Sequence, residues 1–133
     1  MDALKYFEQG FSCSESIIKE AIDMGLCDKS LLPVATSFSG GMSSGCLCGT
    51  IAAAQMVIGS IFGKENQKNY EVKARIIAKE FIDRFKEQHK ATCCKVLTRG
   101  MDMASPERKN HCKNLVIFAS NLLKELTQET VAK

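Results

Sequence analysis

The residues best suited to chemistry in this chain are its seven cysteines. Two of them lie in the segment Gly45-Cys46-Leu47-Cys48-Gly49, which precedes a run of small and apolar residues. The other candidate sites, at predicted helix starts or on apolar helix faces, are Cys13, the Cys93-Cys94 pair and Cys112. Thiols that converge in one core can exchange disulfides or bind a metal ion. Their spacing leaves both kinds of chemistry open.

The predicted places of these cysteines along helices indicate how reactive each one is. The first turn of a helix presents unbonded N–H groups and the positive end of the helix dipole, which stabilise a thiolate and lower its pKa. We therefore expect lowered thiol pKa values at the sites near helix starts, which are Cys13, Cys46, Cys48, and Cys93 or Cys94. Cys112 lies about two turns into its predicted helix, so we expect it to receive no help from the dipole.

Other catalytic and metal-binding patterns are weak. No Cys-x-x-Cys pair occurs, so neither a thioredoxin-type motif nor a zinc ribbon is supported. His89 and His111 could add imidazole ligands, although histidines are more often solvated or structural. We interpret the carboxylates of Asp23, Glu80 and Asp83, which fall on predicted polar faces, as surface groups.

The composition narrows the class of protein. A chain of 133 residues with 45% apolar and 25% charged residues is typical of one soluble globular domain. Its net charge of +3 comes from dispersed basic residues, which does not favour nucleic acid binding. The first residues contain acids and lack an apolar run, so we expect no signal peptide. The odd number of cysteines favours a reducing cytoplasmic location over a disulfide framework.

The elements that must position the cysteines are all predicted to be helices, because apolar residues recur with the helical period and strand-like alternation is absent. We expect an all-α bundle of about five helices in a single domain spanning residues 1–133. The predicted helices cover residues 13–24, 28–38, 45–62, 70–88 and 105–126, with a short helical turn at residues 93–97.

The predicted 45–62 helix is apolar all round, which places it at the centre of the bundle. It is too short for a membrane span and contains Gln55, so we expect no transmembrane segment. The glycine- and serine-rich segment 39–45 before it is expected to be irregular. The apolar excess on this helix and on the last one is compatible with a homodimer.

Helix starts are indicated by capping residues. Ser12 and Glu15 form a capping box, which places Cys13 in a first turn and on the buried stripe of that helix. The other expected caps are Asp28 for the second helix, Thr92 for the short turn, and Ser105 with Pro106 for the last helix.

Four segments carry cysteines in a recognisable pattern: Gly10-Phe11-Ser12-Cys13, Ser39-Gly40-Gly41-Met42 followed by Cys48-Gly49-Thr50-Ile51-Ala52-Ala53-Ala54-Gln55-Met56-Val57-Ile58-Gly59, Cys94-Lys95-Val96-Leu97-Thr98, and Cys112-Lys113-Asn114-Leu115-Val116. Together they resemble the C_GCAxxG_C_C family, whose small members carry four characteristic cysteines and are described as redox-active. The resemblance covers nearly the whole chain. It departs at Thr50, where the motif has alanine, and at Ala53, where it has glycine.

The resemblance implies which cysteines matter. Carried over position by position, the family cysteines are Cys13, Cys48, Cys94 and Cys112, which leaves Cys27, Cys46 and Cys93 as additional thiols. A related domain occurs in split-Soret-type cytochromes, for which an iron–sulfur centre has been proposed. The resemblance thus implies redox activity and also supports a metal site.

Three interpretations of the four thiols follow. In the first, the protein is a thiol oxidoreductase or electron carrier that meets a redox partner protein; two thiols cycle between dithiol and disulfide, with Cys48 or Cys13 as the nucleophile and Cys112 as the resolving thiol. In the second, the four thiolates bind an iron–sulfur cluster or a zinc ion. In the third, the cysteines are buried packing residues of a structural or interaction protein.

Overall fold

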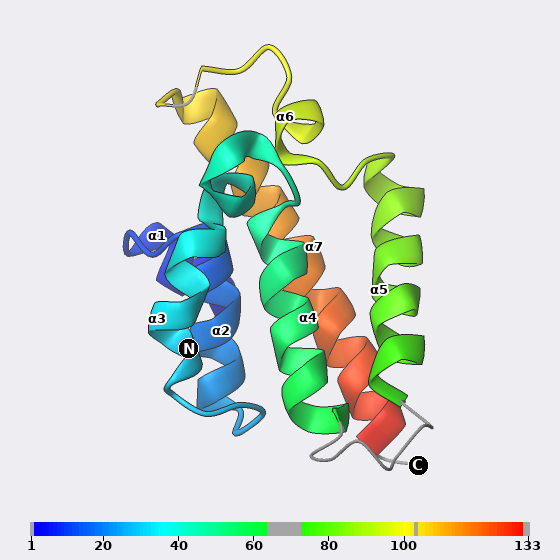
Figure 1. The fold of residues 1–133 in the computed structure, drawn as a ribbon. Helices are drawn as coiled ribbons and strands as arrows, with labels where there is room; N and C mark the ends of the chain where they lie inside the picture. Colours follow the sequence, from blue (N-terminus) through cyan, green and yellow to red (C-terminus); the bar gives the residue numbers. More distant parts are fainter. Residues whose placement is uncertain (1, 64–72, 103, 132–133) are drawn as a thin grey trace.

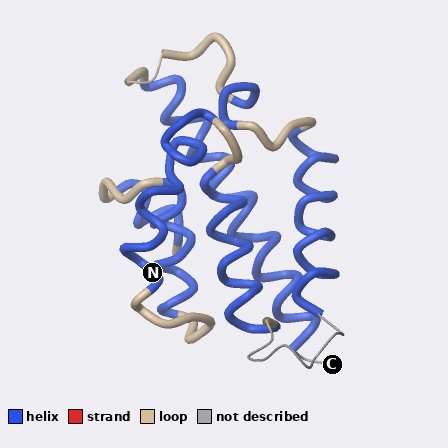
Figure 2. Tube along the Cα trace, viewed as in Figure 1, coloured by secondary structure: helices blue, strands red, loops and turns tan. Residues whose placement is uncertain are grey.

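The described part of the chain folds into helices, as the helical period of its apolar residues predicts. The computed structural model describes residues 2–63, 73–102 and 104–131, and these ranges contain no strand (Figures 1 and 2). The elements are α1 (Ala3–Glu8), α2 (Cys13–Asp23), α3 (Leu31–Ala35), η1 (Thr36–Phe38), η2 (Gly41–Gly45), α4 (Gly49–Phe62), α5 (Lys73–His89), α6 (Cys94–Leu97) and α7 (Pro106–Val131).

Helix α4 forms the centre of the bundle, as its apolar composition predicts. It packs against α2, α5 and α7, and Figure 1 shows it between α2 and α5 with α7 behind it. Its small residues let the neighbouring helices approach closely, and side chains such as Ile17 of α2, Phe81 of α5 and Val116 of α7 complete the core. None of the described helices is both long enough and apolar enough to cross a bilayer.

Two of the four predicted caps are confirmed. The Ser12 hydroxyl accepts a hydrogen bond from the Glu15 N–H, and the Glu15 carboxylate accepts one from the Ser12 N–H at 2.9 Å. The Ser105 hydroxyl accepts from the Arg108 N–H at 3.1 Å at the start of α7. These two caps set the first turns of α2 and α7, which carry residues of the site described below.

The caps predicted at Asp28 and Thr92 are wrong. Asp28 accepts a hydrogen bond from the N–H of Ser30, so it stabilises the turn before α3 rather than the helix itself. Cys93, and not Thr92, precedes α6, and no side chain caps that turn. The 70–88 helix is described from Lys73, and its predicted first residues lie outside the described ranges.

The central helix begins at Gly49 rather than at residue 45, because the chain before it turns with the opposite hand. Gly40, Gly41, Met42 and Ser43 have φ values between 57° and 64°. Left-handed backbone costs about 1–2 kcal/mol at each residue that carries a Cβ, so this segment cannot continue into a right-handed helix. The prediction of an irregular segment is confirmed, and Cys46 consequently lies outside the first turn of α4.

The sequence analysis missed α1, which is held by a buried carboxylate. Glu20 of α2 is only 5% exposed and accepts hydrogen bonds from the Ala3 N–H at 2.8 Å and from the Ser120 hydroxyl at 2.6 Å. Lys124 of α7 forms an ion pair with the same carboxylate at 3.3 Å. One side chain therefore ties α1, α2 and α7 together.

Candidate functional site

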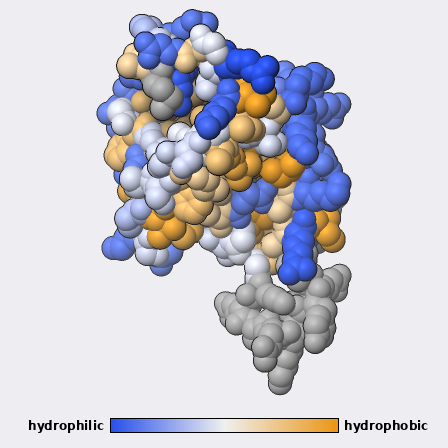
Figure 3. All heavy atoms as spheres, turned by 45° about the horizontal axis from the view of Figure 1, so that its top comes forward, coloured by the Kyte–Doolittle hydropathy of each residue, from blue (hydrophilic) through white to orange (hydrophobic). Residues whose placement is uncertain are grey.

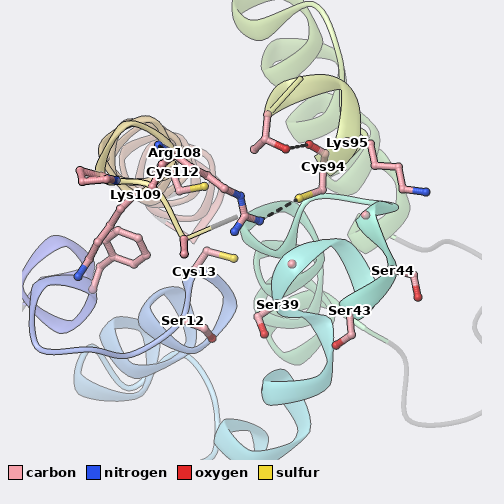
Figure 4. A pocket seen from close by; sticks show the side chains of 17 residues that line it. Ser12, Cys13, Ser39, Ser43, Ser44, Cys94, Lys95, Arg108, Lys109 and Cys112 are labelled. Carbon is pink, nitrogen blue, oxygen red and sulfur yellow. Dashed lines mark hydrogen bonds between the residues drawn. The ribbon is translucent and has the colours of Figure 1, made fainter. Parts of the chain in front are cut away.

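A cavity of about 930 Å³ lies at the end of the bundle where α6 meets the start of α7 (Figure 4). Three of the predicted site cysteines line it: Cys13 from the first turn of α2, Cys94 from α6 and Cys112 from α7. Figure 3 brings this end of the molecule forward and shows hydrophilic and apolar residues mixed over its surface. The fold therefore brings together cysteines that are far apart in the sequence.

Cys48, the fourth predicted cysteine, is buried with an exposed fraction of 5% and does not line the cavity. It is near enough to the other three for their charges to interact: a charge on Cys48 raises the pKa values of Cys13 and Cys112, and a charge on Cys94 raises the pKa of Cys48.

A short backbone pairing fixes Cys48 beside Cys94. Leu47 and Cys93 form an isolated antiparallel bridge. Beside it, the Cys48 N–H donates to the Thr92 carbonyl at 2.8 Å, and the Cys94 N–H donates to the Cys46 carbonyl. No strand pattern in the sequence indicates this pairing, because it involves only a few residues on each side.

Glycines make room for two of the thiols. A Cβ on Gly49 would lie 2.7 Å from the Sγ of Cys13, so the sulfur packs directly against the glycine backbone. A Cβ on Gly41 would lie 2.5 Å from the Cβ of Cys94, and Gly41 also has a positive φ of 64°. Both glycines are needed for the thiols to stand where they do.

At Cys13 the effect of burial on the thiol pKa is larger than the effect of its place at a helix start. Burial raises the pKa of this thiol from 9.0 to about 12, and the nearby Cys48 adds to the increase. The backbone N–H groups of Gly40 and Ser14 act in the opposite direction, but with less effect. The expected lowering of the Cys13 pKa is therefore wrong. Removing the thiolate from water costs more free energy than its hydrogen bonds with backbone N–H groups contribute.

Burial also raises the pKa of Cys48. Three hydrogen-bonding groups lower it: the Thr50 hydroxyl, 3.1 Å from the sulfur, and the N–H groups of Thr50 and Ile51. The residue stands immediately before α4, as predicted for a helix-start thiol. Its depth in the core nevertheless makes it a poor thiolate.

The sequence analysis missed Arg108, a cation that contacts one of the cavity thiols. Its Nη2 donates a hydrogen bond to the Sγ of Cys94 at 3.8 Å, and Figure 4 shows its side chain reaching toward that sulfur from α7. Burial raises the pKa of Cys112, but the Arg108 charge opposes this increase. Cys112 therefore does receive electrostatic help, from a side chain one turn earlier on its own helix. The four-residue spacing between them was the available signal.

The three additional cysteines lie outside the cavity wall. Cys27 is half-buried near Asp28, and burial raises its pKa. Cys46 is exposed. The Cys93 thiol donates to the Gly45 carbonyl at 3.2 Å. All seven cysteines are free thiols in this structure.

The side chains as placed do not fit a preformed metal site. His89 packs its ring on Phe85 and Phe118, at centroid distances of 4.8 and 4.7 Å, and burial lowers its pKa. Within the described ranges, no three or more histidine, cysteine or acidic side chains lie close enough to hold a metal ion. Neither an iron–sulfur nor a zinc ligand set is therefore assembled by these residues.

A family model described as "Putative redox-active protein (C_GCAxxG_C_C)" matches residues 11–126, a range that includes all four predicted site cysteines. Separate comparisons with curated proteins and with solved structures find no match.

Proposed function

The chain belongs to the C_GCAxxG_C_C family of redox-active proteins, and from this we propose that it carries out thiol–disulfide exchange at the cavity lined by Cys13, Cys94 and Cys112. The hydrogen bond from Arg108 to Cys94 carries the proposal. A guanidinium favours the anionic form of a sulfur that it contacts, and the thiolate is the species that attacks disulfides.

Cys94 is the attacking thiol in this proposal. Its thiolate attacks one sulfur of a substrate disulfide, which forms a mixed disulfide and releases the other half of the substrate as a thiolate. A second cysteine then loses its proton to solvent and attacks the Cys94 sulfur, releasing the second half. The net reaction oxidises two cysteine thiols to one disulfide and reduces one substrate disulfide to two thiols.

Cys112 is the first candidate for the second step. It lines the same cavity as Cys94, and the charge of Arg108 favours its ionisation. Cys13 lines the cavity as well and is the alternative resolving thiol. The attacking role moves from Cys48 or Cys13 to Cys94 because Arg108 contacts the Cys94 sulfur, although this side chain is itself only 8% exposed. Burial raises the pKa values of the other two thiols.

Stepwise oxidation of the reduced protein tests the proposal. The folded chain is equilibrated with mixtures of a small disulfide and its thiol, denatured in acid, and alkylated for peptide mapping by mass spectrometry. We expect two thiols, Cys94 among them, to be lost and then recovered on reduction. Cys94→Ser should abolish this step, whereas Cys27→Ser, a change outside the cavity, should leave it intact.

Three outcomes would overturn the proposal. The first is a Cys94→Ser protein that oxidises as the wild type does. The second is a set of thiols that resist both oxidation and alkylation while the protein is folded, which would make the cysteines packing residues. The third is stoichiometric zinc, or iron with acid-labile sulfide, in protein purified without oxygen. That result would establish a metal site assembled on binding.

A further inference from the structure

We infer that the cavity takes a low-molecular-weight disulfide of a cysteine-containing peptide, with free carboxylates toward both of its ends. The inference rests on the proposed thiol exchange and names its substrate class. A cavity of about 930 Å³ lies within the usual range for small-molecule sites.

The charge of the cavity wall favours an anion. Lys95, Arg108 and Lys109 line it, and among its described lining residues none is acidic. The first turns of α2 and α7 also contribute to the wall, so the positive ends of two helix dipoles add to this field. A cleft lined by one sign of charge concentrates ligands of the other sign.

The cations are arranged along the cavity rather than gathered at one point. Figure 4 shows the side chains of Lys95 and Lys109 extending toward opposite sides, with Arg108 and the Cys94 sulfur between them. The stem of Lys95 lies close over Gly45, where a Cβ would come within 2.5 Å of the lysine Cγ. This order matches a molecule whose disulfide is central and whose carboxylates are terminal.

Hydroxyl groups in the wall add acceptors for N–H groups. The Ser39 hydroxyl donates to the Thr36 carbonyl at 2.9 Å, and the Ser43 hydroxyl donates to the Ser37 carbonyl at 3.1 Å. With their protons engaged, these oxygens present only lone pairs to a ligand in the cavity. Acceptors beside cations suit a ligand that carries amide or amino groups as well as carboxylates, which is the chemistry of a peptide.

Three disulfide probes of different charge test the inference. Glutathione disulfide is anionic, 2-hydroxyethyl disulfide is neutral and cystamine is cationic. The rate at which each consumes the Cys94 thiol is measured at low ionic strength and divided by its rate with a small neutral thiol. We expect the normalised rate for glutathione disulfide to exceed that for the neutral probe by about tenfold or more, and cystamine to be slowest.

Lysine variants locate the effect. Lys95→Gln and Lys109→Gln are expected to slow the anionic probe several-fold and to leave the neutral one unchanged. Lys113→Gln is the matched control, since this lysine lies one turn further along α7 and outside the cavity wall.

Equal normalised rates for the three probes, or an equal effect of Lys113→Gln and Lys109→Gln, would overturn the substrate class while leaving thiol exchange in place. Failure of every probe to oxidise Cys94 would instead overturn the thiol exchange on which the inference rests.

Discussion

The Sγ of Cys13 packs against the backbone of Gly49, at a place where a Cβ on that glycine would come within 2.7 Å of the sulfur. The contact joins the first turn of α2 to the first residue of α4. The position of a site thiol is thus determined by the absence of a side chain at the start of the central helix.

Replacing this glycine should destabilise the fold. We expect Gly49→Ala to lower the free energy of unfolding by about 1–3 kcal/mol, the usual cost of overpacking a core, measured by urea denaturation. A second change, Cys13→Ala, should recover only part of the loss, because the Phe38 carbonyl oxygen would still lie 2.9 Å from the new Cβ.

Gly59→Ala on the same helix is the matched control, since a Cβ there meets nothing within 4 Å. It should be neutral or stabilising by up to about 1 kcal/mol, because alanine favours helices over glycine. Equal stabilities for the two alanine variants would show that the contact is not close-packed.

The raised pKa of Cys13 predicts both slow modification and an alkaline loss of stability. In the unfolded chain this thiol ionises near 9.0, whereas in the fold it stays protonated up to about 12. The stability it contributes is complete below pH 9 and is lost as the pH rises toward 12. Unfolding measured between pH 8 and about 11 should therefore show a slope that Cys13→Ala reduces.

Alkylation supplies an independent check on the same thiol. With iodoacetamide at neutral pH and peptide mapping, Cys13 should react far more slowly than the exposed Cys46 in the same sample. Comparable rates for the two cysteines would contradict the burial of the Cys13 sulfur.

Arg108 should control the reactivity of Cys94. We expect Arg108→Gln to slow the reaction of Cys94 with small disulfides by about tenfold, since hydrogen bonds to charged groups contribute about 1.5–3 kcal/mol and 1.4 kcal/mol corresponds to a factor of ten. It should also raise the pKa of Cys112 further, because the opposing charge is lost. Arg99→Gln, which removes an exposed arginine just after α6, controls for net charge. If both variants react alike, the guanidinium does not act on the Cys94 sulfur.

Removing the Glu20 carboxylate should be among the most destabilising changes in the chain. Glu20→Ala leaves the Ala3 N–H, the Ser120 hydroxyl and the Lys124 ammonium without this acceptor. We expect a loss of about 3–5 kcal/mol in the free energy of unfolding. Glu80→Ala, which breaks the exposed pair with Arg84, should cost less than about 1 kcal/mol. Thermal unfolding followed by circular dichroism measures the loss of stability in each variant. Similar losses for Glu20→Ala and Glu80→Ala would contradict the role of Glu20.

The long helices could be predicted because their apolar residues either form one stripe at the helical period, as in α5, or surround the helix, as in α4. Ile77, Phe81 and Phe85 define the buried face of α5 by spacing alone, and the small residues of α4 indicate a central position. The short α1 could not be predicted in this way. It depends on Glu20, a charged residue whose burial is set by three partners from distant parts of the chain.

The sequence indicates cysteines that the fold brings to one end of the bundle, but it does not indicate their pKa values. Sequence spacing places Cys13 at a helix start, yet its pKa depends on how deeply that helix start is buried, which no local pattern reports. The contact of Arg108 with Cys94 could not be predicted, because the two residues lie on different helices; only its four-residue spacing from Cys112 is visible in the sequence. The left-handed turn at Met42 and Ser43 likewise shifted the start of α4, since residues with a Cβ rarely take that conformation.

The bridge between Leu47 and Cys93 also bears on when the site forms during folding. It closes a loop that contains the whole of α4 and α5, and the entropy lost in closing such a loop is recovered only when those helices pack together. Contacts between residues this distant in sequence slow folding, because the loop must close before the contact forms. During synthesis, a growing chain displays Cys13 and Cys48 as separate thiols long before α7 supplies Arg108 and Cys112. The reactive arrangement therefore arises together with the finished bundle, and any partial unfolding that separates α4 from α5 removes it.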